Sequence, residues 1–250
     1  MTRDRERSIT TALVSLTSHL VGQLDVVDLL TELTADCERL LDVASAGLLL
    51  ADGRGVLHVL AASSERTRSL ELLQLQRDEG PCLDSYHGHA PVLVPDLRRE
   101  RERWPHFVDA ATEAGFVSVH ALPMRLRDRP LGTLGLFGTE VGSLNADDLS
   151  LAQAMADVAS IALIANQAAD DQAVLTKTLQ GALSSRVVIE QAKGLLAQLG
   201  GLEMPEAFAV LRRYARDHNR RFHDVADHLV SRQLDAASVL TDARARPGRG

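Results

Sequence analysis

The stretch FVSVHALPMRLRDRPLGTLGLFG, residues 116–138, indicates the fold class because it reads as a β-hairpin. Apolar residues dominate both halves of the stretch. Asp128, Arg129 and Pro130 lie between the halves, and such residues are typical of a tight turn. Two strands joined by a short turn pair antiparallel, so the sequence predicts an antiparallel sheet rather than a parallel one.

Glycines mark the second strand of this hairpin. Gly132, Gly135 and Gly138 are expected to leave room on one side of the strand, where a neighbouring segment can approach closely. Two further β regions lie upstream: residues 44–63 form two apolar runs around a glycine-containing turn, and residues 92–94 form a short apolar run. The sheet is therefore expected to contain at least five strands.

Helical spacing of apolar residues, at intervals of three and four, surrounds these strands. The segments with this spacing are 7–43, 66–76, 100–114 and 145–183. Asp25 is placed to cap a second helix within the first segment, and Trp104 and Phe107 are expected to anchor the third in the core. This order predicts an α+β fold, an antiparallel sheet flanked by helices and followed by a long connecting helix.

The C-terminal part is expected to form a three-helix bundle. Its helices are predicted at about 184–199, from about 203 and at about 223–234, and Gly200-Gly201 is suited to end the first of them. Residues Ser185–Leu234 contain eight basic and six acidic residues, whereas residues 1–183 contain 16 basic and 26 acidic residues. A basic module on an acidic body favours a polyanion as the partner of the bundle.

The bulk composition is that of an ordinary globular protein of two domains. The chain has 250 residues, 45% of them hydrophobic, and a net charge of −7, which argues against a general nucleic-acid coat. The charged N-terminus lacks a signal core, and two cysteines make no disulfide framework, so a cytoplasmic location is expected. No phosphate-binding loop, nucleophile elbow or zinc-protease motif occurs, so no enzyme is predicted.

Residues 8–168 resemble a GAF domain of the type found in actinobacterial regulators. The resemblance rests on the order of elements and on three stretches: EGPCLDSYHGHAPVLVPDL, WPHFVDAATEAGFVSVHALPMRL and PLGTLGLF. GAF domains imply a small-molecule or redox sensor, although many members only dimerise. The resemblance names no ligand, and the cofactor stays unknown.

The C-terminal blocks SRxxIExAKGxL, EAFxxLRxxA and RxFxDVA resemble the ANTAR domain, the RNA-binding module of transcription antitermination regulators. The resemblance spans Ser185 to about Val230. The positions that match its motifs are Ile189, Ala192, Lys193, Gly194, Ala207, Phe208, Leu211, Arg212, Ala215, Val225 and Ala226. The chain departs from the family pattern at Ala197, Glu203 and Phe222. The family implies a leader RNA with paired hairpins, whose folding excludes a terminator so that transcription continues.

Arginine suits such a role because it combines charge, a bidentate fork and a stacking plane. The candidate RNA-binding residues are Arg186, Lys193, Gly194, Arg212, Arg213, Arg216, Arg220 and Arg221, which folding is expected to gather on one tip. A helix-interior glycine such as Gly194 costs about 1 kcal/mol relative to alanine, so a helix or a nucleotide is expected to approach the backbone there. The alternative for any one arginine is a solvated helical face.

Other features of the sequence allow more than one interpretation. Cys82 is a candidate sensor residue, but a buried structural cysteine is the other reading. His87 and His89 lack a third ligand at recognisable spacing, so no metal site is predicted. The helix from residue 145 either dimerises as a coiled coil or closes the GAF core. Its candidate seams are Leu149, Ala152, Ala156, Ala159 and Leu163, or Leu151, Val158, Ala162 and Ala165.

The expected organisation is a GAF-like sensor domain at 8–168, a helical connector at 169–184, an ANTAR domain at 185–234 and a disordered tail at 235–250. The expected function is that of a homodimeric, signal-responsive antitermination regulator, in which the GAF domain shifts the population of RNA-binding states. Two alternatives remain: a DNA-binding regulator, because three short helices with arginines imitate a helix-turn-helix, and a protein-interaction module without nucleic-acid binding.

Overall fold

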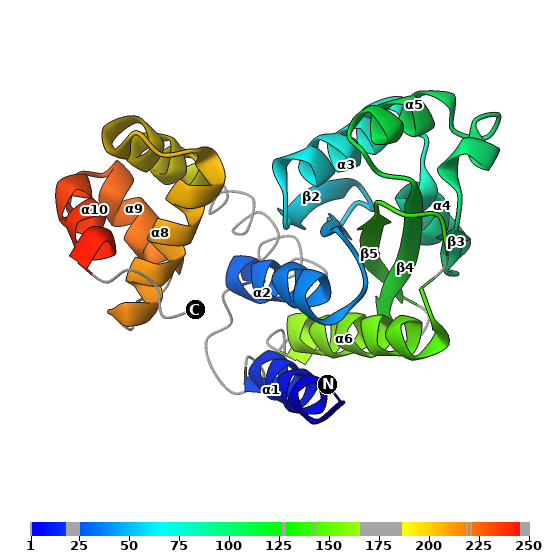
Figure 1. Ribbon diagram of the computed structural model, residues 1–250, viewed down its shortest axis with the longest axis horizontal. Helices are drawn as coiled ribbons and strands as arrows, with labels where there is room; N and C mark the ends of the chain where they lie inside the picture. The colour runs from blue at the N-terminus through cyan, green and yellow to red at the C-terminus, as the bar shows by residue number, and fades with distance from the viewer. Residues whose placement is uncertain are drawn as a thin grey trace. The chain divides into compact units, whose positions relative to one another are not determined.

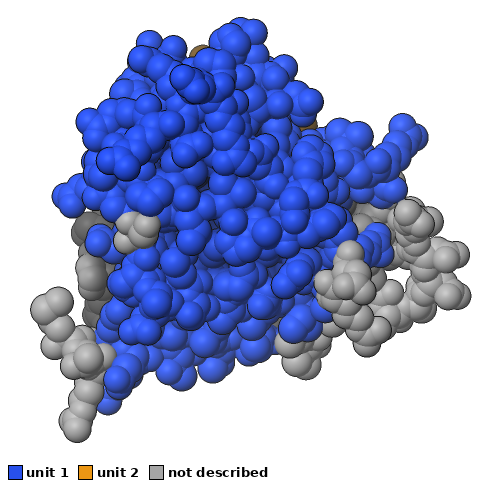
Figure 2. Space-filling view, turned by 90° about the vertical axis from the view of Figure 1, so that its right-hand side faces the viewer, with its two compact units in different colours: residues 1–179 blue, residues 180–250 orange. Residues whose placement is uncertain are grey.

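The computed structural model divides the chain into two compact units, residues 1–179 and residues 180–250, each described by itself (Figure 1). Figure 2 shows one face of the first unit in blue. The residues that the structure describes are 2–18, 26–126, 129–142, 144–165, 187–218, 220 and 222–245. Asp25, the predicted cap, and the predicted connector at 169–184 lie outside them. The architecture of the first unit is the predicted α+β type.

A five-stranded antiparallel sheet forms the centre of the first unit, with strand order β2-β1-β5-β4-β3. The strands are β1 (Ser45–Ala51), β2 (Leu57–Ala62), β3 (Val92–Val94), β4 (Ser118–Leu126) and β5 (Arg129–Gly138). The last two form the predicted hairpin, in which Leu122 pairs with Leu134. The central position of β5, between β1 and β4, makes this hairpin the core of the sheet.

The turn of the hairpin is shorter than the sequence predicts. Arg129 and Pro130, expected in the turn, lie in β5 and pair with Leu126 and Arg125. The register shifts between Met124 and Arg125, and a proline is tolerated at such an irregularity because the ladder there needs no N–H donor.

Helices cover both faces of the sheet (Figure 1). One face carries α1 (Thr2–Ser18), α2 (Val26–Leu40) and α6 (Ala146–Ala165). The other carries α3 (Glu65–Arg77), α4 (Pro81–Gly88) and α5 (Pro105–Glu113). The prediction of a helix at 100–114 is wrong in its first part. A 3-10 turn (Leu97–Glu100) precedes α5, and α5 begins at Pro105 because proline suits a first helical position. Trp104 and Phe107 are buried core anchors, as predicted.

The described part of the long helix closes the core of the first unit. Ala152, Ala156, Ala159 and Leu163 form most of one predicted coiled-coil seam, and all four are buried within this chain. They pack in a helix that contacts α1, α2 and β4. In α6 these side chains are therefore already occupied by the chain's own core, and a dimer seam along them would need that core to open.

The second unit contains four described helices rather than three. They are a helix at residues 187–200, α8 (Met204–Asp217), α9 (Phe222–Val230) and α10 (Ala236–Ala245). Buried apolar residues include Ile189, Ala192, Leu196, Leu211, Val225 and Leu229, as the spacing predicts. The same apolar spacing would also place Leu199 inward, but this residue is 60% exposed.

Helix α10 corrects the prediction of a disordered tail for residues 236–245. Ala236 and Val239 are buried, and α10 packs against α8. The Asp235 carboxylate accepts a hydrogen bond from the backbone N–H of Ala237 at 3.2 Å, which satisfies a free donor in the first turn. The sequence signal is weak because only a few small apolar side chains are needed to dock so short a helix.

Candidate functional site

Lys193, a predicted RNA contact, lies inside the C-terminal bundle. The residue is only 5% exposed, and its Nζ donates to the Glu190 carboxylate at 3.0 and 3.2 Å. The ammonium also lies over the Phe208 ring, 5.5 Å from the ring centroid, which is a cation–π distance. Lys193 therefore joins the first helix of the bundle to α8, and its charge is held within the fold.

We expect Lys193→Ala to destabilise the second unit by roughly 2 kcal/mol, because the Glu190 carboxylate and the Phe208 ring lose this partner. Urea unfolding monitored by hydrogen exchange of amides in residues 187–218 measures the effect. Gln191→Ala, an exposed change on the same helix, is the matched control. Unchanged protection in Lys193→Ala together with weaker RNA binding would contradict this structural role.

Arg213 also has an internal partner. Its side chain is half-buried, and Nη2 donates to the carbonyl oxygen of Ala243 at 3.0 Å. That carbonyl belongs to the last turn of α10, where helical carbonyls lack intrahelical donors and a cation is favourable. Arg213 thus fastens α10 to α8.

Of the remaining predicted cations, the structure describes the side chains of two. Arg212 and Arg220 are exposed, Arg212 on α8 and Arg220 after its end. Arg186 and Arg221, and the side chain of Arg216, lie outside what the structure describes. Gly194 sits mid-helix, and a Cβ added there would meet no described atom within 4 Å, so no described side chain requires glycine at this position.

In the first unit, a buried polar cluster lies between α3, α4 and the sheet. Glu71 is fully buried; its carboxylate accepts from Gln74 Nε2 at 2.7 Å and from Cys82 Sγ at 3.5 Å. The Gln74 Oε1 accepts from the backbone N–H of Cys82 at 2.9 Å. A Cβ on Gly135 would lie 2.7 Å from Glu71 Oε1 and 2.9 Å from Cys82 Sγ, so this glycine makes the space that the cluster occupies.

Burial sets the protonation of this cluster. It raises the pKa of Glu71 to about 8, against the opposing effect of the Cys82 hydrogen bond. Burial, and then the neighbouring Glu71 carboxylate, raise the pKa of Cys82 well above its usual value. A protonated, inaccessible thiol is a weak nucleophile, so in this state Cys82 acts as a hydrogen-bond donor of the core. Its role as a sensor stays a prediction.

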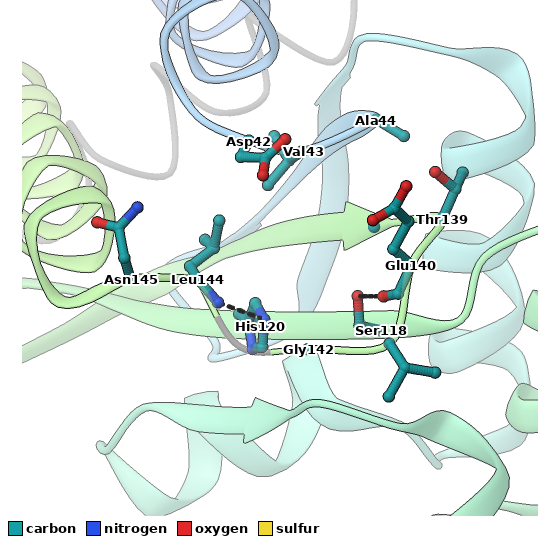
Figure 3. Close-up of a pocket in the computed structure, with 12 residues that line it drawn as sticks. Asp42, Val43, Ala44, Ser118, His120, Thr139, Glu140, Gly142, Leu144 and Asn145 are labelled. Carbon is teal, nitrogen blue, oxygen red and sulfur yellow. Dashed lines mark hydrogen bonds between the residues drawn. The ribbon is translucent and has the colours of Figure 1, made fainter.

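A pocket of about 500 Å³ lies on the other side of the sheet, at the ends of β4 and β5 (Figure 3). Its walls come from the α2–β1 connection, which includes Asp42, from Ser118 and His120 on β4, and from the β5–α6 connection, which includes Glu140. Ser118 Oγ donates to the Glu140 carbonyl at 2.8 Å, which ties β4 to that connection. The sequence pattern around His120 gives no sign of this pocket.

His120, like Ser118, is a buried polar residue of this pocket. It is 3% exposed, and burial lowers its pKa, so the imidazole is neutral at pH 7. Nε2 accepts from the backbone N–H of Leu144 at 3.3 Å, which places the proton on Nδ1. Within the described residues Nδ1 has no hydrogen-bond partner. The pocket therefore has a buried imidazole and the carboxylates of Asp42 and Glu140 in its walls.

Comparison with known families assigns both units. Residues 23–164 match the family model described as GAF domain, which is more than half of the chain. The chain belongs to the GAF domain family. Residues 177–230 match the family model described as ANTAR domain, so the protein contains both. GAF domains are sensor domains, and ANTAR domains are RNA-binding modules of antitermination regulators, which indicates a regulatory protein.

Solved GAF domains share the fold at low sequence identity. The GAF domain from an Acinetobacter phosphoenolpyruvate-protein phosphotransferase is 12% identical; the alignment covers 68% of this chain and 99% of that one, with a TM-score of 0.53. The phycoerythrobilin-bound GAF domain from a cyanobacterial phytochrome is 18% identical over 64% of this chain and 96% of that one, with a TM-score of 0.50. No curated protein matches the chain significantly.

Among the residues that the structure describes, no group of three histidine, cysteine, aspartate or glutamate side chains is placed to hold a metal ion. No described helix is both long and apolar enough to cross a membrane.

Proposed function

We propose that this GAF–ANTAR protein is a cytoplasmic, homodimeric regulator that stabilises a hairpin-containing leader RNA and so promotes transcription antitermination. The observation that carries the proposal is the ANTAR match at residues 177–230 on a folded helical unit. Its exposed Arg212 and Arg220 supply cations for phosphate contacts. No catalytic role is proposed, because the two matched domains are those of sensors and RNA-binding regulators.

The internal hydrogen bonds of Lys193 and Arg213 reduce the set of residues proposed to contact RNA directly. A cation that is paired within the bundle stabilises the fold, and its loss weakens RNA binding only indirectly. The proposal therefore places direct phosphate contacts at Arg212 and Arg220. Arg186, Arg216 and Arg221 stay in the proposed set on the family resemblance alone, and Gly194 stays because its open backbone leaves space for a nucleotide.

The GAF domain is proposed as the sensory part. The pocket around His120 supports this role, because a concave site with a few convergent polar groups is suited to a small molecule. Ligand binding there would shift the populations of two states that differ in RNA affinity.

The decisive experiment is selection and binding with a library of two-hairpin RNAs with randomised loops. We expect the full-length protein to enrich particular loops and to bind them more tightly than duplex DNA of equal length. In a salt series, Arg212→Ala should reduce the magnitude of the negative slope of log K against log salt by about 0.7. Arg54→Ala, which removes an equal exposed charge from the GAF unit, is the control and should leave the slope unchanged.

Two outcomes would overturn the proposal. A preference for duplex DNA over every enriched RNA would favour the DNA-binding alternative. Binding to neither nucleic acid above the level of a non-specific polyanion would favour a protein-interaction module.

A further inference from the structure

Two rings stack at the C-terminal end of α8. Tyr214 and His218 are one helical turn apart, with ring centroids 4.0 Å apart and ring planes inclined by 21°. Of the aromatic pairs that the described residues form, this is the one in stacked geometry; the others meet edge-on or tilted. Tyr214 is half-buried and His218 is exposed, so the stack lies on the surface of the bundle.

The orientation of His218 is fixed by a second interaction. Its Nδ1 lies 3.0 Å from the carbonyl oxygen of Tyr214. A carbonyl oxygen only accepts, so Nδ1 carries the proton and donates, which leaves Nε2 of the neutral ring as an acceptor. Stacking on one face and a hydrogen bond at one edge hold the imidazole rigidly while the residue stays exposed. Such a ring requires little ordering when a planar ligand stacks on it.

Arg220 follows His218 by two positions in the chain and is also held in place. Its backbone N–H donates to the Ala215 carbonyl at 2.9 Å, which ends α8. Its Nη2 donates to Nδ1 of His228 on α9 at 2.6 Å. A guanidinium has five N–H donors, and this side chain is exposed, so the fork can bind an anion while one arm remains on His228.

We propose that Tyr214, His218 and Arg220 form a site for one unpaired nucleotide of an RNA loop. The base would stack on the exposed imidazole of His218, which is backed by Tyr214, and the adjoining phosphate would bind Arg220. A flat platform beside a cation is the combination by which proteins bind splayed-out bases. In a duplex both faces of each base are already stacked, so the site favours a loop. This inference rests on the proposed RNA-binding function.

The test uses the full-length protein and an RNA that the library selects. Anisotropy titrations measure affinity. 2-Aminopurine placed at each loop position in turn reports stacking, because its fluorescence is quenched when it stacks. We expect one loop position to be quenched by the wild-type protein. His218→Ala should abolish that quenching and weaken binding by about fivefold to 100-fold.

Two further variants separate the platform from a structural role. His218→Phe keeps a planar ring and should retain the quenching and bind within a few-fold of the wild type. Gln198→Ala, an exposed change on another helix of the unit, should change neither readout.

The outcomes separate this inference from the proposed function. If His218→Ala binds and quenches like the wild type while Arg212→Ala weakens binding, the nucleotide site is overturned and RNA binding stands. If the wild type enriches no RNA, the proposed function itself is overturned. Preferred binding of duplex DNA overturns both.

Discussion

Replacing Gly132 with alanine is expected to prevent stable folding of the GAF domain. Gly132 pairs with Leu50 of β1 in the centre of the sheet. A Cβ at this position would collide with the carbonyl oxygen of Leu49 and would lie 2.8 Å from Cδ2 of Leu50. A backbone oxygen in a paired strand has no free direction in which to move. The expected loss of unfolding free energy is more than about 4 kcal/mol, a size reserved for severe core defects.

The measurement is far-UV circular dichroism together with fluorescence of Trp104, which is buried in the GAF core. Gly88→Ala is the matched control, because an added Cβ there meets nothing within 4 Å and the change should stay within about 0.5 kcal/mol. A Gly132→Ala protein with wild-type fluorescence and melting temperature would show that β1 can move away from β5.

The three glycines of β5 show how far sequence reasoning reaches. It predicts close approaches at Gly132, Gly135 and Gly138, and each added Cβ does meet other atoms. The expectation that all three glycines leave room on the same side of the strand is wrong. Successive residues of a strand alternate faces, so positions three apart point in opposite directions. Gly132 meets β1, Gly138 meets the hydroxyl of Ser118, and Gly135 faces Glu71 and Cys82.

The sequence does not reveal which polar side chains are buried. On helical spacing alone, Glu71 reads as a surface residue of α3. It is buried because Gly135 of the facing strand lacks the side chain that would otherwise fill that space. Lys193 likewise reads as a surface cation, yet its long apolar stem lets the ammonium reach Phe208 and Glu190 within the bundle. Both placements depend on what a distant segment leaves open.

The nucleic-acid surface can be predicted from the sequence only in part, because some of its contacts are local and others join distant segments. The three ANTAR blocks locate the bundle, because their apolar positions fold locally into helices. The stack of Tyr214 on His218 was visible in principle as two rings one turn apart. The hydrogen bond from Arg220 to His228 could not be predicted in this way, because it joins residues on different parts of the bundle. Arg213 donates a hydrogen bond to Ala243 of α10, and α10 lies outside the matched ANTAR region altogether.

The second large effect is expected from Glu71→Gln, as a change in how stability depends on pH. The pKa of Glu71 is about 8 in the folded protein against an ordinary value of 4.5, so the folded state binds the extra proton between these values. The contribution of this proton on Glu71 to the unfolding free energy is fully present below about pH 4.5 and is lost as the pH rises towards 8. The slope is at most about 1.4 kcal/mol per pH unit.

Glutamine stays neutral and keeps an oxygen that can accept from Gln74 or Cys82. The variant should therefore match the wild type near pH 5 and exceed its unfolding free energy at pH 9 by on the order of 3 kcal/mol, after relaxation of the buried site is allowed for. Urea unfolding followed by Trp104 fluorescence at pH 5, 7 and 9 measures this. Cys82 adds little to the difference, because its raised pKa keeps the thiol protonated in this range.

Glu113→Gln is the control, because Glu113 is an exposed carboxylate on α5 whose loss should leave the pH profile of the wild type unchanged. Parallel profiles for wild type and Glu71→Gln would mean that Glu71 ionises as it does in water. That result would require α3 to separate from the sheet in solution and admit water to Glu71. The cluster of Glu71, Gln74 and Cys82 would then be an opening element of the GAF domain rather than a closed part of its core.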